Sequence, residues 1–206
     1  IPDDVSLEAG ALLVDMLGTP FRAVKRAQLR PGDQVGIWGA GPIGIGALMV
    51  AARFGARAAV VDLNDGRLAM ARDLGAEMVV NPSRDDVDDA LAAWTEGRGI
   101  GAAFDCVGEQ TVAEQALRAL RVRGTLVVVG VSRELTLDPW EDLICRELTV
   151  FGTRNFNARE FGEMVSLVQD GLPVERVVTH RFPLEEAEEA FALFQSGKCG
   201  KILFVG

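Results

Sequence analysis

Residues 35–44 read VGIWGAGPIG, an apolar run that leads into three closely spaced glycines, Gly39, Gly41 and Gly44. The run predicts a buried strand and the apolar segment after Gly44 predicts a helix, which places the glycines at a strand-to-helix turn. Gly39 permits the tight turn, Gly41 lets the backbone approach a pyrophosphate, and Gly44 lets helix and strand pack closely. The helix would direct free N–H groups and the positive end of its dipole toward that pyrophosphate. The stretch therefore predicts a dinucleotide site, the alternative being a glycine-rich turn without a ligand.

An acidic residue, Asp62, closes the next predicted strand, eighteen residues after Gly44. A carboxylate at this distance accepts hydrogen bonds from the hydroxyls of the adenosine ribose in dinucleotide-binding folds. The 2′-phosphate of NADP would lie against this carboxylate. The repulsion between the two groups at about 4 Å is on the order of 4 kcal/mol per unit charge at an effective dielectric near 20. The sequence therefore predicts NAD rather than NADP. The alternative is a solvated acid that caps the helix starting near Asn64. Arg67 is expected either to flank the adenine or ribose or to be exposed on that helix.

Six short strands alternate with helices through the middle of the chain. Their sequences are continuous apolar runs, such as AAVV at residues 58–61 and LVVV at residues 126–129, which is typical of a parallel sheet covered on both faces. The pattern predicts an α/β fold with a doubly wound, six-stranded Rossmann sheet of strand order 3-2-1-4-5-6 and a ligand at the switch between strands one and four. We expect strands at 34–39, 58–62, 77–81, 101–106, 124–131 and 148–153, and helices at 43–54, 64–74, 83–94 (capped by Ser83) and 109–119.

The two ends of the chain depart from this alternation. A helix over about 6–17, capped by Asp3 or Asp4, and a second helical stretch after Pro20 precede the sheet. The tail is expected to contain helices at 158–170 and 184–195 and strands at 177–182 and 201–205, packed on the sheet or on a partner domain. We therefore divide the chain into residues 1–30, a dinucleotide-binding domain at 31–156, and residues 157–206. Because it starts at Ile1 without a methionine, we expect it to be a piece of a longer protein.

The composition is that of an ordinary globular protein, with 49% hydrophobic and 25% charged residues in 206. A formal charge of −9 argues against nucleic acid or an anionic membrane as a partner. No apolar run approaches membrane-spanning length, and no targeting segment is evident at the start. The three cysteines are irregularly spaced and form neither a disulfide framework nor a zinc knuckle, which favours a reducing, cytoplasmic location.

Asp15 is the only polar side chain between Ala9 and Gly18. A helix that is apolar all round is expected to be buried, and a buried carboxylate needs a cation, a metal or several hydrogen-bond donors. The sequence alone does not choose among them. The simpler alternative is an acid paired with an arginine or capping a neighbouring helix.

Taken together, these landmarks resemble the cofactor-binding half of the medium-chain dehydrogenases, in particular the zinc-containing alcohol and polyol dehydrogenases. The resemblance spans nearly the whole chain. It rests on Asp15 with Thr19, the turn at 30–33, the glycine motif, Asp62 and Arg67, and the segments 74–76, 104–108, 124–130, 178–184 and 196–201.

The resemblance implies roles for the first two of these residues. Asp15 stands where the family places the third protein ligand of a catalytic zinc, and Thr19 would lie beside the nicotinamide. Zinc would act as a Lewis acid on the substrate oxygen. The other two ligands would come from a preceding domain, and one carboxylate does not complete a zinc site. We therefore expect the chain by itself to bind cofactor weakly and to be inactive.

The resemblance also implies contacts to the cofactor. Pro42 and Ile43 belong to the glycine turn, and Lys201 would face the pyrophosphate. The remaining contacts would be Cys106 and Val107 on the adenine side, Val129, Gly130 and Val131 near the nicotinamide, and Asn155 at its carboxamide. The simpler alternatives are that the apolar strand ends are buried in the core and that Lys201 is a solvent-exposed residue beside the site. The lone histidine, His180, is expected to be structural.

The leading interpretation is the NAD-binding domain of a zinc-dependent dehydrogenase that transfers hydride from a small alcohol or polyol to NAD. One alternative is a zinc-free quinone or enone reductase, which Asp62 opposes, and another is a nucleotide-binding module without chemistry. Short-chain dehydrogenases are excluded because the chain has no tyrosine. Family members commonly pair sheet edges, so the segment 135–150 is a candidate for homo-oligomer formation as a dimer or tetramer. The acidic runs 85–89 and 185–189 are expected to be solvated surface.

Overall fold

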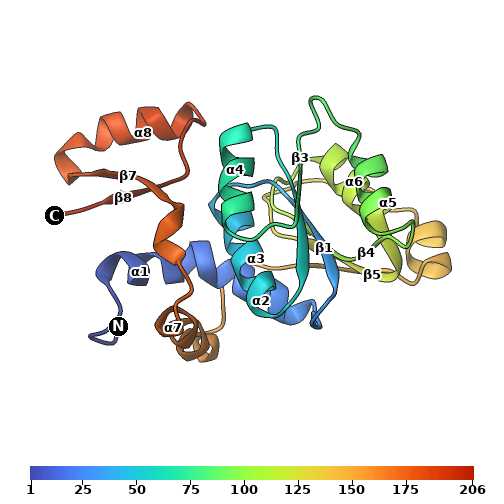
Figure 1. Cartoon of the computed structure of the whole chain (residues 1–206), viewed down its shortest axis with the longest axis horizontal. Coiled ribbons are helices and arrows are strands. Elements are labelled where there is room, and N and C mark those ends of the chain that lie inside the picture. Colours follow the sequence, from blue (N-terminus) through green and yellow to red (C-terminus); the bar gives the residue numbers. More distant parts are fainter.

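A computed structural model describes all 206 residues and contains the expected six-stranded parallel sheet (Figure 1). The strand order is β3-β2-β1-β4-β5-β6, as the sequence predicts. The reversal of order falls between β1 and β4, where β1 pairs with β2 on one side and with β4 on the other. The strands are β1 (Gln34–Trp38), β2 (Arg57–Val61), β3 (Met78–Val80), β4 (Ile100–Asp105), β5 (Leu120–Val128) and β6 (Thr149–Gly152).

Helices cover both faces of this sheet, which explains the continuous apolar strands. Neighbouring residues of one strand enter different cores: Val60 belongs to a cluster of 32 buried residues, and Val61 to a cluster of 13 on the other face. The larger cluster includes residues of α3 (Pro42–Arg53) and α4 (Asp65–Asp73), and the smaller one residues of α5 (Val87–Trp94) and α6 (Gln110–Ala119).

The N-terminal helical segment runs without a break from Leu7 to Arg26. It consists of α1 (Leu7–Leu12), one π-helical turn, η1 (Leu13–Leu17), and α2 (Gly18–Arg26). The expected cap at Asp3 or Asp4 is wrong, because the Ser6 hydroxyl accepts a hydrogen bond from the Ala9 N–H at 3.0 Å. A hydroxyl directly before the first helical residue satisfies a donor that the helix itself leaves free.

Several further boundaries differ from the sequence prediction, among them the start of β5, which lies at Leu120 and not at residue 124. Helix α5 starts at Val87 under an Asp86 cap, and Ser83 instead bonds to the side chain of Asn81. Strand β5 ends at Val128, because the N–H groups of Val129 and Gly130 both donate to one carbonyl oxygen at the end of β4. The chain therefore leaves the ladder before residues 129–131, which the sequence prediction had placed in the strand.

The C-terminal part forms a second, smaller unit. Strands β7 (Val178–Phe182) and β8 (Lys201–Phe204) make a separate parallel pair, with α8 (Ala187–Gln195) between them in the chain. Figure 1 shows this lobe to the side of the main sheet, above α1. Helix α7 (Phe161–Gln169) contacts η1 and α2 instead. Short turns complete the chain: η2 (Pro139–Cys145), η3 (Ala158–Glu160), η4 (Val174–Val177) and η5 (Leu184–Glu186).

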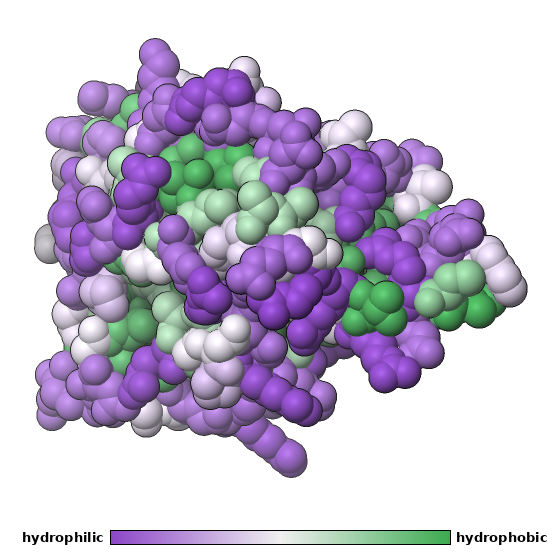
Figure 2. All heavy atoms as spheres, turned by 45° about the vertical axis from the view of Figure 1, so that its right-hand side comes forward, coloured by the Kyte–Doolittle hydropathy of each residue, from purple (hydrophilic) through white to green (hydrophobic).

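Hydrophilic atoms cover most of the face shown in Figure 2, and hydrophobic atoms gather there in separate patches. None of the helices combines the length and the apolar character needed to cross a membrane. The acidic runs at 85–89 and 185–189 lie mostly exposed, as expected for solvated surface.

Candidate functional site

The glycine turn joins β1 to α3 with the geometry that its sequence predicts. Gly39 has φ +91°, a left-handed conformation that side chains disfavour. A Cβ on Gly44 would overlap the carbonyl oxygen of Gly39, so the helix packs directly on the turn. A Cβ on Gly41 would meet no atom within 4 Å, so this position borders open space. Pro42 occupies the first helical position, where no N–H is needed.

The Asp62 carboxylate is fixed by two backbone donors at the mouth of this turn. Its Oδ2 accepts from the Ala40 N–H at 2.7 Å, and its Oδ1 accepts from the Asn64 N–H at 2.7 Å. Asn64, not Asp62, caps helix α4, since its side chain accepts from the Arg67 N–H at 3.1 Å. The alternative of a helix-capping Asp62 is therefore wrong. Each carboxylate oxygen still has room to accept a further hydrogen bond.

Three cavities follow the carboxyl ends of the strands, where ligands bind in open α/β sheets. The Asp62 cavity is about 670 Å³, the Thr19 cavity about 690 Å³, and the lysine cavity between the glycine turn and the α8–β8 loop about 220 Å³. Every predicted site residue except Gly44 lines at least one of them. The Asp62 cavity contains Gly39, Gly41, Asp62, Arg67, Cys106 and Val107, the Thr19 cavity Asp15, Thr19, Ile43, Val129, Gly130, Val131 and Asn155, and the lysine cavity Gly41, Pro42, Arg67 and Lys201.

Of the apolar strand ends in these cavities, Cys106 and Val129 pack against the larger core, whereas Val107 and Val131 do not. Val107 is 43% exposed and Val131 is 94% exposed, so neither supports the alternative of buried packing. Asn155 has φ +54°, a backbone conformation in which Asn is enriched. Val107, Val131 and Asn155 form accessible walls of the cavities at the ends of β4, β5 and β6.

Asp15 is exposed, so the expectation of a buried carboxylate is wrong. The π-helical turn packs Met16 and Leu17 against the core but leaves Val14 and Asp15 outside, so this helix is not apolar and buried all round. The hydroxyl of Thr19, which is buried, donates to Asp15 Oδ1 at 3.1 Å. The pair therefore presents a carboxylate and a hydroxyl to the Thr19 cavity.

Asp15 has no companions that would complete a metal site. Nowhere in the structure do three His, Cys, Asp or Glu side chains cluster in a way that could hold an ion. A catalytic zinc needs three protein ligands, so the residues present do not fit a zinc ion by themselves.

Asp105, at the end of β4, organises the crevice and was not among the predicted site residues. Its buried carboxylate accepts from the N–H groups of Val107 and Gly108, both at 2.9 Å, through Oδ1. Its carbonyl oxygen accepts from the N–H groups of Val129 and Gly130. Asp105 thereby ties the ends of β4 and β5 together. The sequence signal that could have identified Asp105 was an acidic residue at the end of an apolar strand, three residues before a glycine.

Cys106 and His180 are the remaining side chains whose chemistry could matter to the site. Burial raises the pKa of the Cys106 thiol far above its usual value, and the neighbouring Asp105 carboxylate raises it further. His180 lines none of the three cavities. Its ring stacks on Phe182, and its Nδ1 lies 2.9 Å from the Thr179 hydroxyl. This placement agrees with the expected structural role.

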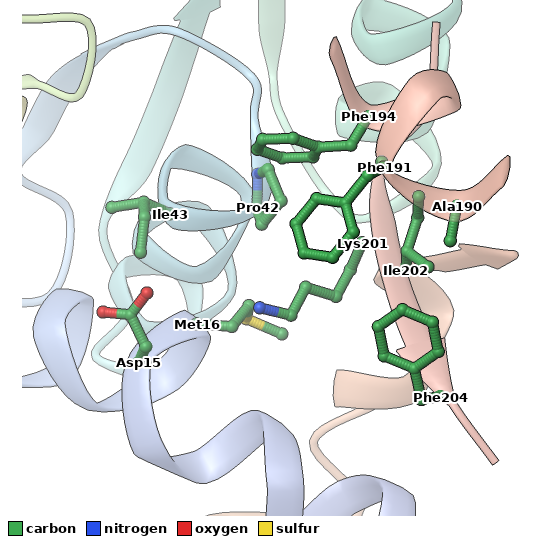
Figure 3. Close-up of a pocket in the computed structure, with 11 residues that line it drawn as sticks. Asp15, Met16, Pro42, Ile43, Ala190, Phe191, Phe194, Lys201, Ile202 and Phe204 are labelled. Atoms are coloured by element: carbon green, nitrogen blue, oxygen red, sulfur yellow. The ribbon is translucent and has the colours of Figure 1, made fainter. Parts of the chain in front are cut away.

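A fourth space, the aromatic cavity, shares lining residues with both the lysine and the Thr19 cavities and measures about 390 Å³. Figure 3 shows Phe191 and Phe194 from α8 and Phe204 from β8 on one side, facing Pro42, Ile43 and Met16. The Lys201 side chain crosses this space with its ammonium group toward Met16 and Asp15. Phe191 and Phe194 are 59% and 63% exposed, so the apolar face of α8 is only partly covered.

Comparison with known proteins gives a consistent set of relatives. The family model described as zinc-binding dehydrogenase matches residues 42–170. Sorbitol dehydrogenase from Macaca fascicularis is 34% identical over 98% of this chain and 57% of its own length. L-Threonine 3-dehydrogenase from Chromobacterium violaceum is 32% identical over 98% of this chain and 60% of its own length.

Solved structures agree with the sequence relatives. An alcohol dehydrogenase from Thermus sp. ATN1 superposes with a TM-score of 0.95 at 28% identity, covering 100% of this chain and 60% of the other. The 2R,3R-butanediol dehydrogenase from Bacillus subtilis gives 0.91 at 31% identity, with the same coverage. The chain thus spans 57–60% of the length of these relatives.

Proposed function

Because the chain belongs to the zinc-binding dehydrogenase family, we propose that it is the NAD-binding part of an enzyme that oxidises a small alcohol or polyol. Three of the relatives above are named for compounds that carry hydroxyl groups: sorbitol, L-threonine and 2R,3R-butanediol. The observation that carries the proposal is the Asp62 carboxylate, held by the Ala40 and Asn64 N–H groups at the edge of a cavity of about 670 Å³.

The residues of this chain fit an NAD molecule laid along the carboxyl ends of the strands. The adenosine would occupy the Asp62 cavity, with its ribose hydroxyls donating to Asp62. The pyrophosphate would lie against the open side of Gly41, at the start of the twelve-residue helix α3. The nicotinamide would enter the Thr19 cavity between Val129, Val131 and Asn155. In this arrangement the reacting end of the cofactor would lie beside Asp15 and Thr19.

NAD bound there would supply the acceptor for a hydride from the carbon that bears the substrate hydroxyl. The chain's own part in that reaction would be to position the substrate and the cofactor. The Thr19 hydroxyl, now hydrogen-bonded to Asp15 Oδ1, can hold the substrate oxygen at the mouth of the Thr19 cavity. Asp15 remains proposed as one zinc ligand of the intact enzyme, whose other ligands would lie outside these 206 residues.

The test is the change Asp62→Ser, which removes the negative charge that opposes a 2′-phosphate. We expect the ratio of NAD to NADP affinity to narrow by about tenfold or more, since 1.4 kcal/mol corresponds to a factor of ten. Calorimetric titration of parent and variant with both cofactors measures the ratio. Asp73→Ser, at an exposed acid at the end of α4, is the matched control and should leave the ratio unchanged. Equal ratios in parent and Asp62→Ser would contradict the proposal.

The proposed partners and location follow from the same features. The net charge of −9 supports a protein that binds neither nucleic acid nor anionic membrane. The three cysteines are unpaired, which supports a reducing, cytoplasmic environment.

We also propose a homodimer formed through the free edge of the sheet. Strand β6 pairs only with β5, and the adjacent turn η2 exposes Trp140, Leu143 and Ile144. An unpaired strand edge beside apolar side chains favours pairing with a second copy.

Light scattering should give twice the mass of one chain. Ile144→Glu should halve that mass, because burying an unpaired carboxylate in the contact between the two copies costs free energy. Leu184→Glu, at an exposed apolar residue of the smaller lobe, should not. A parent protein that is monomeric at high concentration would exclude the dimer.

A further inference from the structure

Trp38 stands at the end of β1, directly before the glycine turn, and its side chain is almost entirely buried. Its indole N–H donates to the amide oxygen Oε1 of Gln115 on α6 at 2.8 Å. An indole nitrogen can only donate, so the oxygen of the amide must be the atom that faces it. This hydrogen bond therefore fixes the orientation of the Gln115 amide.

The other end of the same amide has no partner in the protein. Gln115 Nε2 carries two N–H donors, and neither donates to another protein group. Three side-chain polar atoms of the chain are buried without a partner, and Gln115 Nε2 is not one of them. The nitrogen is therefore accessible, and Gln115 is part of the lining of the Asp62 cavity. The cavity thus contains a free amide donor whose direction is set by the protein.

The Asp62 cavity reaches across the end of β1. Asp62 follows β2, whereas Gln115 lies on α6, which contacts β4, and β1 is the strand between β2 and β4. The rest of the lining includes six apolar side chains: Trp38, Val61, Leu63, Pro82, Val107 and Val112. A flat heteroaromatic ring suits such a space, because apolar walls cover its faces and a single polar group sets its orientation.

Adenine has the groups that this donor needs, since its ring nitrogens N1, N3 and N7 are hydrogen-bond acceptors. In the proposed position of NAD the ribose hydroxyls donate to Asp62, and the base is attached to that same sugar. The base would therefore lie in the Asp62 cavity, with Gln115 at one of its edges. The two residues would recognise different parts of the nucleoside, Asp62 the sugar and Gln115 the base.

We propose that Gln115, oriented by Trp38, donates a hydrogen bond through Nε2 to a ring nitrogen of the adenine and thereby determines which base the cavity accepts. The proposal rests on the proposed function for the identity of the ligand, and it adds a residue that recognises the base. Trp38 is a positioning residue in this scheme, because it acts through the Gln115 amide.

The first test uses adenosine and its 1-deaza, 3-deaza and 7-deaza analogues, each of which replaces one ring nitrogen by a C–H group. In calorimetric titrations of the full chain, one analogue should bind about fivefold more weakly than adenosine, the effect expected when one neutral hydrogen bond is lost. In Gln115→Met this penalty should disappear. Equal binding of all three analogues and adenosine by the parent would overturn the proposal, and so would a penalty that persists in Gln115→Met.

The second test keeps the contact with Trp38 and removes only the donor. Gln115→Glu retains an oxygen for the indole N–H but replaces Nε2 by a second acceptor, so it should weaken adenosine binding at least as much as Gln115→Met. Thr111→Val, at an exposed residue of the same helix, is the matched control and should leave adenosine binding unchanged. Unchanged adenosine affinity in Gln115→Glu would overturn the role of the donor.

The third test addresses the orientation of the amide. Trp38→Phe keeps an aromatic wall but removes the indole N–H, so the amide is free to turn and the penalty for the sensitive analogue should shrink by about half or more. A penalty equal to that of the parent would exclude Trp38 as a positioning residue. Loss of packing alone would not change the ratio between adenosine and its analogue, so this readout separates orientation from stability.

Titration with ADP-ribose separates this proposal from the proposed function. If the parent binds ADP-ribose and Asp62→Ser narrows the preference for NAD over NADP, but no deaza analogue binds more weakly than adenosine, only the base contact is wrong. A parent chain that binds neither ADP-ribose nor adenosine would overturn the proposed function and the base contact together.

Discussion

The carboxylates of Asp62 and Asp15 differ in how the surrounding backbone holds them. Asp62 accepts from two backbone N–H groups, both at 2.7 Å, so its position is set before any ligand arrives. Asp15 has a single hydroxyl partner, Thr19, and is otherwise free on an exposed turn. Preorganised acceptors discriminate between ligands because they need not reorder on binding. Of the two carboxylates, Asp62 is therefore the more rigidly held and Asp15 the less constrained.

The three cysteines are expected to differ in reactivity. Burial and the Asp105 carboxylate keep the Cys106 thiol protonated at any moderate pH, although the residue lines the Asp62 cavity. Cys199 is buried, whereas Cys145 is exposed on η2. Because only an accessible thiolate reacts, iodoacetamide at about pH 8 should modify Cys145 alone in the folded protein. Mass spectrometry after proteolysis measures this, with all three sites modified in denaturant as the control. Modification of Cys106 as fast as Cys145 would contradict the assignment.

At the scale of elements, two glycines of the glycine turn have different roles, one in stability and one in binding. Gly44 brings α3 against the turn, whereas Gly41 borders open space. The two positions lie three residues apart and require glycine for different reasons. Packing against the protein's own backbone explains Gly44, and we propose that Gly41 leaves room for the dinucleotide.

Two alanine substitutions test this separation. Gly44→Ala should destabilise the protein by about 1–3 kcal/mol, because the added methyl group overlaps the Gly39 carbonyl. That corresponds to a fall in Tm of about 2–4 °C per kcal/mol for a chain of this size. Gly41→Ala, with φ −70° and no neighbour to strike, should change stability by less than about 0.5 kcal/mol yet weaken NAD binding. Thermal unfolding and NAD titration of both variants provide the measurement. Loss of stability in Gly41→Ala with intact binding would reverse the assignment.

On the scale of the whole molecule, long-range polar contacts join the smaller lobe to the rest. Arg181 of β7 forms two hydrogen bonds with the Glu8 carboxylate of α1, at 2.7 and 2.6 Å. Arg67 joins α4 to the α8–β8 loop. These links span more than 100 residues of sequence. These polar contacts act together with the packing of Leu203 of β8, which belongs to the larger core, to set the position of the lobe.

Acid should weaken the Glu8–Arg181 link. Hydrogen bonding from Arg181 lowers the pKa of the Glu8 carboxyl below its value in an unfolded chain. Its contribution to stability is therefore present above the unfolded pKa, about 4.3, and is lost as the pH falls through the lower folded value. Glu8→Gln should lower Tm slightly at pH 7, and the difference from the parent should shrink as the pH falls below about 4.

Calorimetric scans across that range measure the difference. Glu188→Gln, at an exposed acid of α8, makes the same charge change and should show no such pH dependence. A difference between Glu8→Gln and the parent that stays constant down to about pH 3 would contradict the role of the ion pair.

The sequence by itself determined the strand order, the glycine turn and the acid at the end of β2. Those features depend on apolar runs, glycine spacing and residues a few positions apart, and such local patterns are written in the sequence. Helix caps were less certain, as Ser6 and Asp86 show, because several neighbouring polar residues compete for the same free N–H groups.

Only the tertiary structure decided that Asp15 is exposed, that Asp105 ties β4 to β5, and that Arg67 reaches the α8–β8 loop. Which face of a helix meets solvent depends on what packs against it, and the π-helical turn at Leu13–Leu17 left Asp15 outside. A contact between residues 130 positions apart, such as that of Arg67 with Gly197, depends on how the two lobes pack against one another. No periodicity or spacing in the chain encodes such a contact, because it arises from packing of the whole fold.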